Sequence, residues 1–228
     1  MPKCLLSIQL HLKMIELPVN KLLNIHSHRE GATSEFTIMN HCYGEDFRSD
    51  IGSVGFHPLQ FQQTPKPSLQ LSAFDYPRVL MIGECGIDYR YEVDVKTQTL
   101  IFEEQLDIAE QLRKPVVIHQ VKAYADLLRL RKQRPSSLKM VIHGFRGKKI
   151  LADQLIQAGF YLSFGAHLLE TDQLQQTFGE LPIDRLFLET DESEAPLVKI
   201  YQTAADFSGK SLDELRLQLW QNFKDLYP

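Results

Sequence analysis

Six side chains of the kinds that bind divalent metal ions stand at or near the ends of short apolar runs. They are His26, His28, Glu84, His119, His143 and Asp191. His26 and His28 are two residues apart, and on a β-strand this spacing turns both imidazoles to the same side, where they can share one ion. Histidine nitrogen and carboxylate oxygen are common ligands of zinc and other first-row divalent ions. These residue types therefore predict a metal site.

Each of these residues also has an ordinary structural role. A single histidine at the end of a strand is usually a hydrogen-bonded loop residue, Glu84 before Cys-Gly could cap a turn, and Asp191 could cap a helix. Such roles do not explain six ligand-type side chains that arrive at one end of one sheet, so we favour metal binding. We expect His57, in Gly-Phe-His-Pro, to contact a metal-binding side chain or the substrate and not to bind the metal itself. His41 and His167 are expected to be ordinary loop residues.

The elements that must position these residues follow from an alternation of apolar and amphipathic segments. Short apolar runs predict eight strands, over residues 21–26, 35–40, 52–57, 79–84, 115–119, 139–143, 160–164 and 185–190. Apolar residues at helical spacing predict helices over residues 97–113, 123–133, 148–158, 170–178, 196–207 and 211–227. Strands separated by helices form parallel β-α units, and eight such units predict an α/β fold of the TIM-type (β/α) barrel.

The first third of the chain has only weak helical signal, so we expect some early helices of the barrel to be missing. An open doubly wound sheet is the alternative architecture, but no glycine-rich phosphate loop follows the first predicted strand. In a barrel of parallel strands the carboxyl ends share one face, and active sites are built there. The six candidate ligands would meet on that face.

The composition is that of an ordinary globular protein, with 43% apolar residues, 24% charged residues and a formal net charge of −4. No run of five or more like charges occurs, so the sequence has no basic tail for nucleic acid or lipid. The three cysteines have no C-x-x-C spacing, which predicts free thiols in a reducing compartment. They are Cys4, Cys42 and Cys85. Because no apolar stretch reaches the length of a membrane span, we expect a cytoplasmic protein.

For the domain organisation, the sequence predicts a poorly ordered N-terminal extension over residues 1–20 and a single barrel domain over residues 21–228. Met14 is an alternative start, in which case residues 1–13 do not belong to the native protein. The oligomeric state is not readable from the sequence.

The motifs around the candidate ligands, in their order along the chain, resemble those of one enzyme family. They are His-Ser-His (26–28), Gly-Phe-His-Pro (55–58), GECGIDY (83–89), PVVIH (115–119), VIHGF (141–145) and LETD (188–191). This set resembles the TatD-like metal-dependent hydrolases, a branch of the amidohydrolase-type barrels, from about residue 22 to the C-terminus. The resemblance implies two divalent ions and cleavage of phosphodiester bonds in DNA or RNA, often from the 3′ end.

The resemblance also implies a role for each ligand. His26, His28 and Asp191 would hold one ion, His119 and His143 the other, and Glu84 would bridge the two. Asp191, beside the metal-bound water, is then the best candidate for the general base. Further charge partners for the phosphate oxygens are implied less specifically, because each could equally be a solvated surface charge. They are Arg29, Lys122 and Arg146.

The sequence departs from the family pattern in places that concern the substrate. Asn24 stands where many relatives have an acid, and Asp191 is followed by Glu-Ser-Glu-Ala-Pro. Glu192 and Glu194 add negative charge beside a site that would admit a polyanion. An amidohydrolase-type reaction on a small amide, ester or lactone is therefore the alternative function, and a non-catalytic metal-binding barrel is the third. Four imidazoles favour zinc or a late transition ion, whereas the resemblance favours magnesium or manganese.

Overall fold

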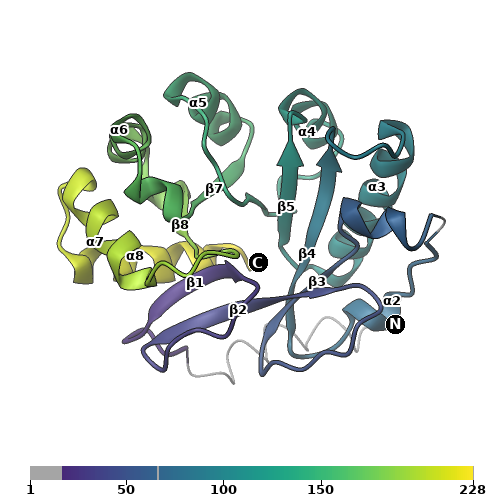
Figure 1. Ribbon diagram of the computed structural model, residues 1–228, viewed down its shortest axis with the longest axis horizontal. Coiled ribbons are helices and arrows are strands. Elements are labelled where there is room, and N and C mark those ends of the chain that lie inside the picture. Colours follow the sequence, from purple (N-terminus) through teal and green to yellow (C-terminus); the bar gives the residue numbers. More distant parts are fainter. Residues whose placement is uncertain (1–16, 66, 228) are drawn as a thin grey trace. The chain divides into compact units, whose positions relative to one another are not determined.

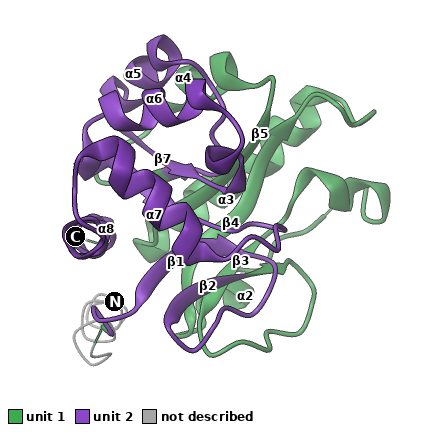
Figure 2. Ribbon diagram, turned by 60° about the vertical axis from the view of Figure 1, so that its left-hand side comes forward, with its two compact units in different colours: residues 1–17, 40–140, 227–228 green, residues 18–39, 141–226 purple. Residues whose placement is uncertain are grey.

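The chain is built from β-strands that alternate with helices. The computed structural model describes residues 17–65 and 67–227, and the chain divides into two compact units (Figure 2). Unit 1 comprises residues 1–17, 40–140 and 227–228, and unit 2 comprises residues 18–39 and 141–226. Residues 1–16 lie outside the described residues. They include Met14, the alternative start, and most of the extension that was predicted over residues 1–20. The single barrel domain stays a prediction.

Unit 1 contains the middle strands and the long helix α3, together with shorter helices (Figure 1). Its elements in order are β3 (Gly52–Gly55), η1 (Pro58–Gln62), α2 (Leu71–Phe74), β4 (Val79–Asp88), α3 (Val95–Leu112), β5 (Val116–Val121) and α4 (Tyr124–Arg131). β4 pairs in parallel with β3 on one side and with β5 on the other. All ten residues of β4 are buried. β4 is thus the central strand of this unit.

Two glutamines on α3 fix the ends of two strands in unit 1. Gln98 and Gln105 are buried and lie on one face of α3, about two turns apart. The Gln98 side chain accepts a hydrogen bond from Asp88 N (2.8 Å) and donates one to Asp88 O (3.1 Å). The Gln105 side chain makes the same pair of bonds with Phe56 N (2.7 Å) and Phe56 O (3.2 Å). α3 therefore holds the backbone beside His57 and at Asp88.

Unit 2 contains the first strand, the last two strands and the C-terminal helices (Figure 1). Its elements are β1 (Leu22–Ser27), α5 (Lys149–Gln157), β7 (Phe160–Phe164), η2 (Ala166–Leu169), α6 (Asp172–Glu180), η3 (Ile183–Arg185), β8 (Leu186–Leu188), α7 (Leu197–Ser208) and α8 (Leu212–Asp225). β2 (Glu35–Cys42) and β6 (Met140–Ile142) cross the boundary between the units. β1 pairs in parallel with β2, and β7 with β8.

The strands follow one another in the sheet in the order of the chain, from β1 to β8. Within unit 2, β1 also meets the residue that follows β8. Asp191 N donates to His26 O and His28 N donates to Asp191 O, each over 3.1 Å, which makes a parallel bridge between Ser27 and Asp191. The first strand and the end of the last strand are therefore neighbours, as the barrel prediction requires.

Two of the predicted strands are longer than the apolar runs that indicated them. β4 continues past Glu84 to Asp88, and β5 continues past His119 to Val121, because Cys85–Asp88 pair with Ile118–Val121. Glu84 and His119 therefore lie inside strands and not at their ends, which corrects the predicted bounds. The described segments 28–34 and 43–51 contain no helix, in agreement with the weak early signal. The Ser211–Glu214 capping box of α8 is formed as expected.

β1, which carries two candidate ligands, is braced by a buried tyrosine of α7. The Tyr201 hydroxyl accepts from Leu23 N (3.2 Å) and donates to Leu23 O (2.8 Å). Tyr201→Phe would leave both buried backbone groups without this partner, so we expect it to lower the free energy of unfolding by about 1–3 kcal/mol. Urea denaturation measures the change. Tyr89→Phe is the control, because its hydroxyl bonds Asp126 at an exposed position. Equal losses in the two variants would contradict the prediction.

Two further expectations concern the chain as a whole. Cys42 and Cys85 are free thiols, as predicted, while Cys4 lies outside the described residues. Burial raises the pKa of the Cys42 thiol to about 11, so this thiol is protonated at neutral pH. Among the described helices, none combines the length and the apolar character needed to cross a membrane.

Candidate metal centre

The first group of candidate ligands lies in unit 2 and consists of His26, His28 and Asp191. His26 is fully buried, and its Nε2 lies 3.6 Å from Asp191 Oδ1. His28 is exposed, and its Nε2 lies 3.5 Å from the same oxygen. One ligand atom from each residue falls within 4.8 Å of the other two. The two imidazoles thus face one carboxylate oxygen, as the His-x-His spacing predicts.

Hydrogen bonds between β1 and the segment after β8 hold this group in place. Asn24 donates from Nδ2 to Thr190 Oγ1 (2.8 Å) and accepts from Thr190 N (3.1 Å) at Oδ1. The Thr190 hydroxyl also donates to Ser27 Oγ (3.1 Å). The Asn24 amide thus binds the residue next to Asp191. Asp191 itself has a φ of 53°, in the left-handed region that aspartate and asparagine tolerate better than most residues.

His143 joins the same unit from the end of β6. Its ring centroid lies 4.5 Å from that of His26, and its ligand atoms fall within 4.8 Å of Glu189 and Asp191. Glu189 is fully buried, its Oε1 accepts from Gly144 N (2.7 Å), and it lies 3.4 Å from His143 Nδ1. Glu189 belongs to the LETD motif, but no role was predicted for it from the sequence. In the structure it is the buried acid behind His143.

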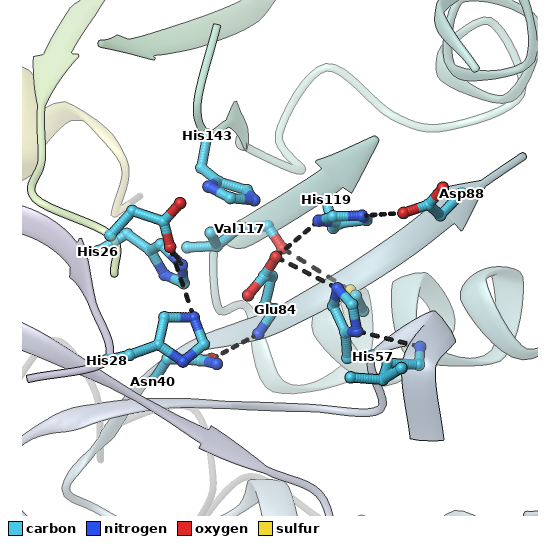
Figure 3. A network of polar contacts seen from close by, with 12 residues as sticks. His26, His28, Asn40, His57, Glu84, Asp88, Val117, His119 and His143 are labelled. Atoms are coloured by element: carbon cyan, nitrogen blue, oxygen red, sulfur yellow. Dashed lines mark hydrogen bonds and ion pairs between the residues drawn. The ribbon is translucent and has the colours of Figure 1, made fainter. Parts of the chain in front are cut away.

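The second group of candidate ligands lies in unit 1 and consists of His57, Glu84 and His119 (Figure 3). Glu84 Oε1 lies 2.8 Å from His119 Nδ1 and 3.4 Å from His57 Nε2. His57 Nδ1 accepts from Leu59 N over 3.0 Å, which leaves Nε2 as the nitrogen that faces Glu84. The sequence predicts a contact role and not a ligand role for His57. The geometry adds His57 to the candidate ligands.

A carboxylate that the sequence analysis does not single out holds His119 from its other side. Asp88 is fully buried and receives His119 Nε2 at 2.9 Å and Arg90 Nη2 at 2.6 Å (Figure 3). Burial alone would raise the pKa of Asp88, but the hydrogen bonds with His119 and Arg90 outweigh it and keep the pKa well below its ordinary value. Asp88 is therefore an anion at neutral pH, so His119 Nε2–H donates to it and Nδ1 remains for a metal or for Glu84.

The strand register explains why His119 lies between two acids. His119 of β5 pairs with Gly86 of β4, and side chains two residues apart on a strand share a face. Glu84 and Asp88 therefore lie on either side of the His119 ring. A side chain at Gly86 would clash with the carbonyl oxygen of His119, and Gly86 has a φ of 154°. Only glycine permits this close approach.

Asp88→Asn is expected to weaken divalent-metal binding by about 10–100-fold, the usual effect of removing the carboxylate behind a metal-binding histidine. The measurement is calorimetric titration of the metal-free protein with Mn²⁺ or Zn²⁺, with nitrogen NMR of the His119 ring as a second readout. The matched control is Asp126→Asn, whose carboxylate accepts from Tyr89 at an exposed position. If both variants bind metal like the parent, Asp88 does not position His119 for a metal.

The three basic residues proposed from the sequence differ in their surroundings. Arg29 Nη1 lies 2.7 Å from Glu194 Oε1, so its charge is already countered at an exposed position. This ion pair lowers the pKa of Glu194. Lys122 follows β5 with a φ of 59°. Arg146 is exposed and lines a pocket that also contains Glu189 and Asp191.

The donor chemistry of both groups fits divalent metal ions. Each combines imidazole nitrogen with carboxylate oxygen, and the ligand atoms of each group lie within 4.8 Å of one another. Buried polar atoms of this kind need compensation, which an ion supplies. The other two described histidines are engaged outside these groups, His41 with Ser49 (2.7 Å) and His167 with Glu170 (2.6 Å). His41 lies in β2 and His167 in η2, so the prediction that both are loop residues is wrong.

Comparison with known proteins gives consistent results for sequence and structure. A family model described as TatD related DNase matches residues 43–228, which include Glu84, His119, His143 and Asp191 but not His26 or His28. The metal-dependent hydrolase YcfH of Escherichia coli is 30% identical over 78% of this chain and 73% of its own length. The human 3′-5′ RNA nuclease TATDN2 is 29% identical over 71% of this chain and 23% of its length.

A further relative is also covered only in part, and the solved structures extend the likeness to the fold. A metal-dependent hydrolase of Buchnera aphidicola is matched over 49% of its length, so the chain spans about half of that relative. The crystal structure of the TatD homologue YJJV from Escherichia coli superposes with a TM-score of 0.74 at 17% identity, over 92% of this chain and 98% of YJJV. This likeness confirms the predicted α/β barrel fold over the open doubly wound alternative.

Proposed function

Because the chain belongs to the TatD-related DNase family, we propose that it is a metal-dependent hydrolase that cleaves phosphodiester bonds of nucleic acid. The order of its motifs predicts this family, and the family match confirms it. The observation that carries the proposal is the pair of imidazole–carboxylate groups, His26–His28–Asp191 in one unit and His57–Glu84–His119 in the other.

We propose two divalent ions, Mg²⁺, Mn²⁺ or Zn²⁺, as the resident cofactors. His26, His28 and Asp191 would hold one ion, His119 and His143 the other, and Glu84 would bridge them, with His57 as a further candidate ligand. When bound, such ions would acidify water and would stabilise the attacking and leaving oxygens of a phosphodiester.

The protein's own groups divide the remaining tasks. Asp191 is partly exposed and its Oδ1 faces both His26 and His28, so it can accept a proton from water at this site. His119 is fixed by Asp88 with Nδ1 toward Glu84. The contact with Asp88 therefore orients the His119 ring.

Nucleic acid is the proposed substrate because TATDN2 carries that activity in its name and the site groups suit phosphodiester chemistry. The acidic loop after Asp191 is less opposed to a polyanion than its sequence indicates. Glu194 is neutralised in part by Arg29, which leaves Glu192 as the acid to be countered. The cytoplasmic location remains a prediction.

The test measures bound metal and hydrolysis together. We expect the protein to contain divalent metal after metal-replete purification and to cleave single-stranded DNA or RNA with at least one of Mg²⁺, Mn²⁺, Co²⁺ and Zn²⁺. Glu92→Gln removes an exposed acid of unit 1 and should cleave like the parent, which controls for a general effect of charge. Hydrolysis of amides, esters or lactones without any phosphodiester cleavage would favour the amidohydrolase-type alternative. Bound metal without hydrolysis of any of these substrates would favour the non-catalytic metal-binding barrel.

A further inference from the structure

Two adjoining pockets in unit 2 lead away from Asp191. The inner pocket has a volume of about 300 Å³, and its lining includes Glu189, Asp191 and Glu192. The outer pocket has a volume of about 220 Å³ and is lined by Arg146, Gly147, His167, Thr171, Gln173 and Leu174. Arg146 and His167 line both pockets. Together the pockets form one groove, which we call the β6–α6 groove.

The two ends of the β6–α6 groove differ in charge. Three acids line the inner pocket, as suits a place for metal ions. No acid lines the outer pocket, and its charged side chain is Arg146. Such a change from acidic to basic lining matches a ligand that places one group on metal and a second anionic group farther along.

Arg146 is available for a ligand. It is exposed, and within the described part of the chain no carboxylate pairs with its guanidinium. Arg29 and Arg90, by contrast, are paired with Glu194 and Asp88. Arg146 also follows His143 by three residues on the loop after β6, so it is tied to the backbone of a candidate ligand. A guanidinium binds phosphate through two parallel hydrogen bonds, which gives geometry as well as charge.

His167 and its neighbours add hydrogen-bonding groups to the outer pocket. Its Nδ1 lies 2.6 Å from Glu170 Oε2, which fixes the ring. Gln173 and Thr171 add neutral polar side chains. The outer pocket is therefore lined by one guanidinium and by side chains that can form hydrogen bonds, which is the chemistry of a phosphate subsite.

We propose that the outer pocket of the β6–α6 groove binds the phosphate next to the one that is cleaved, with Arg146 as its charge partner. This assignment rests on the proposed function and gives the substrate strand a direction across unit 2, from Asp191 toward the start of α6. The groove holds a single strand, since its pockets are small.

The experiment compares substrates with one phosphate and with several. Arg146→Ala should raise the Kd of a short labelled thymidine oligonucleotide by about tenfold or more, as expected for a lost charged hydrogen bond. Binding is measured in EDTA, where metal-dependent cleavage does not occur. The slope of log Kd against log salt concentration should fall by about 0.7, the value for one phosphate contact in a single strand. Hydrolysis of bis(p-nitrophenyl) phosphate should fall less than cleavage of the oligonucleotide, because it has no second phosphate.

Two further variants sharpen the result. Arg146→Lys should keep the salt slope of the parent and recover part of the affinity, because the charge remains. Lys148→Ala removes an exposed cation two residues away that lines neither pocket, and it should change neither slope nor affinity. An unchanged oligonucleotide Kd in Arg146→Ala would overturn the proposal, as would an equal loss on bis(p-nitrophenyl) phosphate. If the parent binds the oligonucleotide with this Arg146 dependence but hydrolyses no phosphodiester, the subsite stands and the proposed catalytic function fails.

Discussion

Asp191→Asn is expected to reduce phosphodiester turnover by about 10²–10⁴-fold, the range for removal of a general base. Asn is the best replacement at this position because it tolerates the left-handed φ of 53°. The backbone bonds of Asp191 N to His26 O and of Asp191 O from His28 N do not involve the side chain. The substitution therefore removes the charge that faces His26 and His28 and leaves the bridge to β1 in place.

The measurement is kcat for Asp191→Asn with a single-stranded substrate, together with urea denaturation to establish that the variant is folded. Glu192→Gln is the matched control at the next residue, and it should retain turnover. A folded Asp191→Asn protein with turnover within tenfold of the parent would remove Asp191 from its proposed role.

Glu84→Gln should weaken metal binding by about 100-fold or more, because the loss of a carboxylate that only supports a ligand already costs about 10–100-fold. The Glu84 side chain is almost fully buried and faces His119 Nδ1 at 2.8 Å and His57 Nε2 at 3.4 Å. Glutamine has nearly the same shape but no charge, so it cannot serve as an anionic ligand. Its backbone N would still donate to Asn40 Oδ1.

Calorimetric titration with Mn²⁺ or Zn²⁺ measures the loss of affinity in Glu84→Gln, and the assay of cleavage follows at saturating metal. Glu92→Gln tests whether any removed charge in unit 1 has this effect, and its affinity should equal that of the parent. Parent-like metal binding in Glu84→Gln would mean that the carboxylate serves only to orient His119 and His57.

The strand pattern predicted the order of the elements and a common face for the candidate ligands, while the grouping of His26, His28 and Asp191 came from the family resemblance. Those three residues meet because β1 lies beside the end of β8, where Ser27 and Asp191 form the bridge that barrel closure requires. The depth of Glu84 within β4 was not predictable. Gly86 interrupts the apolar run, yet β4 continues because Cys85–Asp88 pair with β5.

The acids behind the histidines depend on register, which a single sequence does not reveal. Asp88 reaches His119 because Gly86 lies opposite that histidine, and a shift of one residue would turn Asp88 to the other face of the sheet. Glu189 reaches His143 and Gly144 through its place at the end of β8. Both acids lie in motifs that the sequence displays, GECGIDY and LETD, but neither stands at the end of an apolar run.

The geometry of the candidate site depends on the number of residues between two glutamines of α3. Gln98 and Gln105 face the same way because seven residues are close to two full turns, and each residue advances a helix by about 100°. An insertion or deletion of one residue between them would rotate one amide away from its strand while every candidate ligand stayed in the sequence. Relatives with a different number of residues between these two positions should therefore lack one of the two contacts between a glutamine side chain and a strand backbone. A comparison of the candidate metal ligands alone would not show this change.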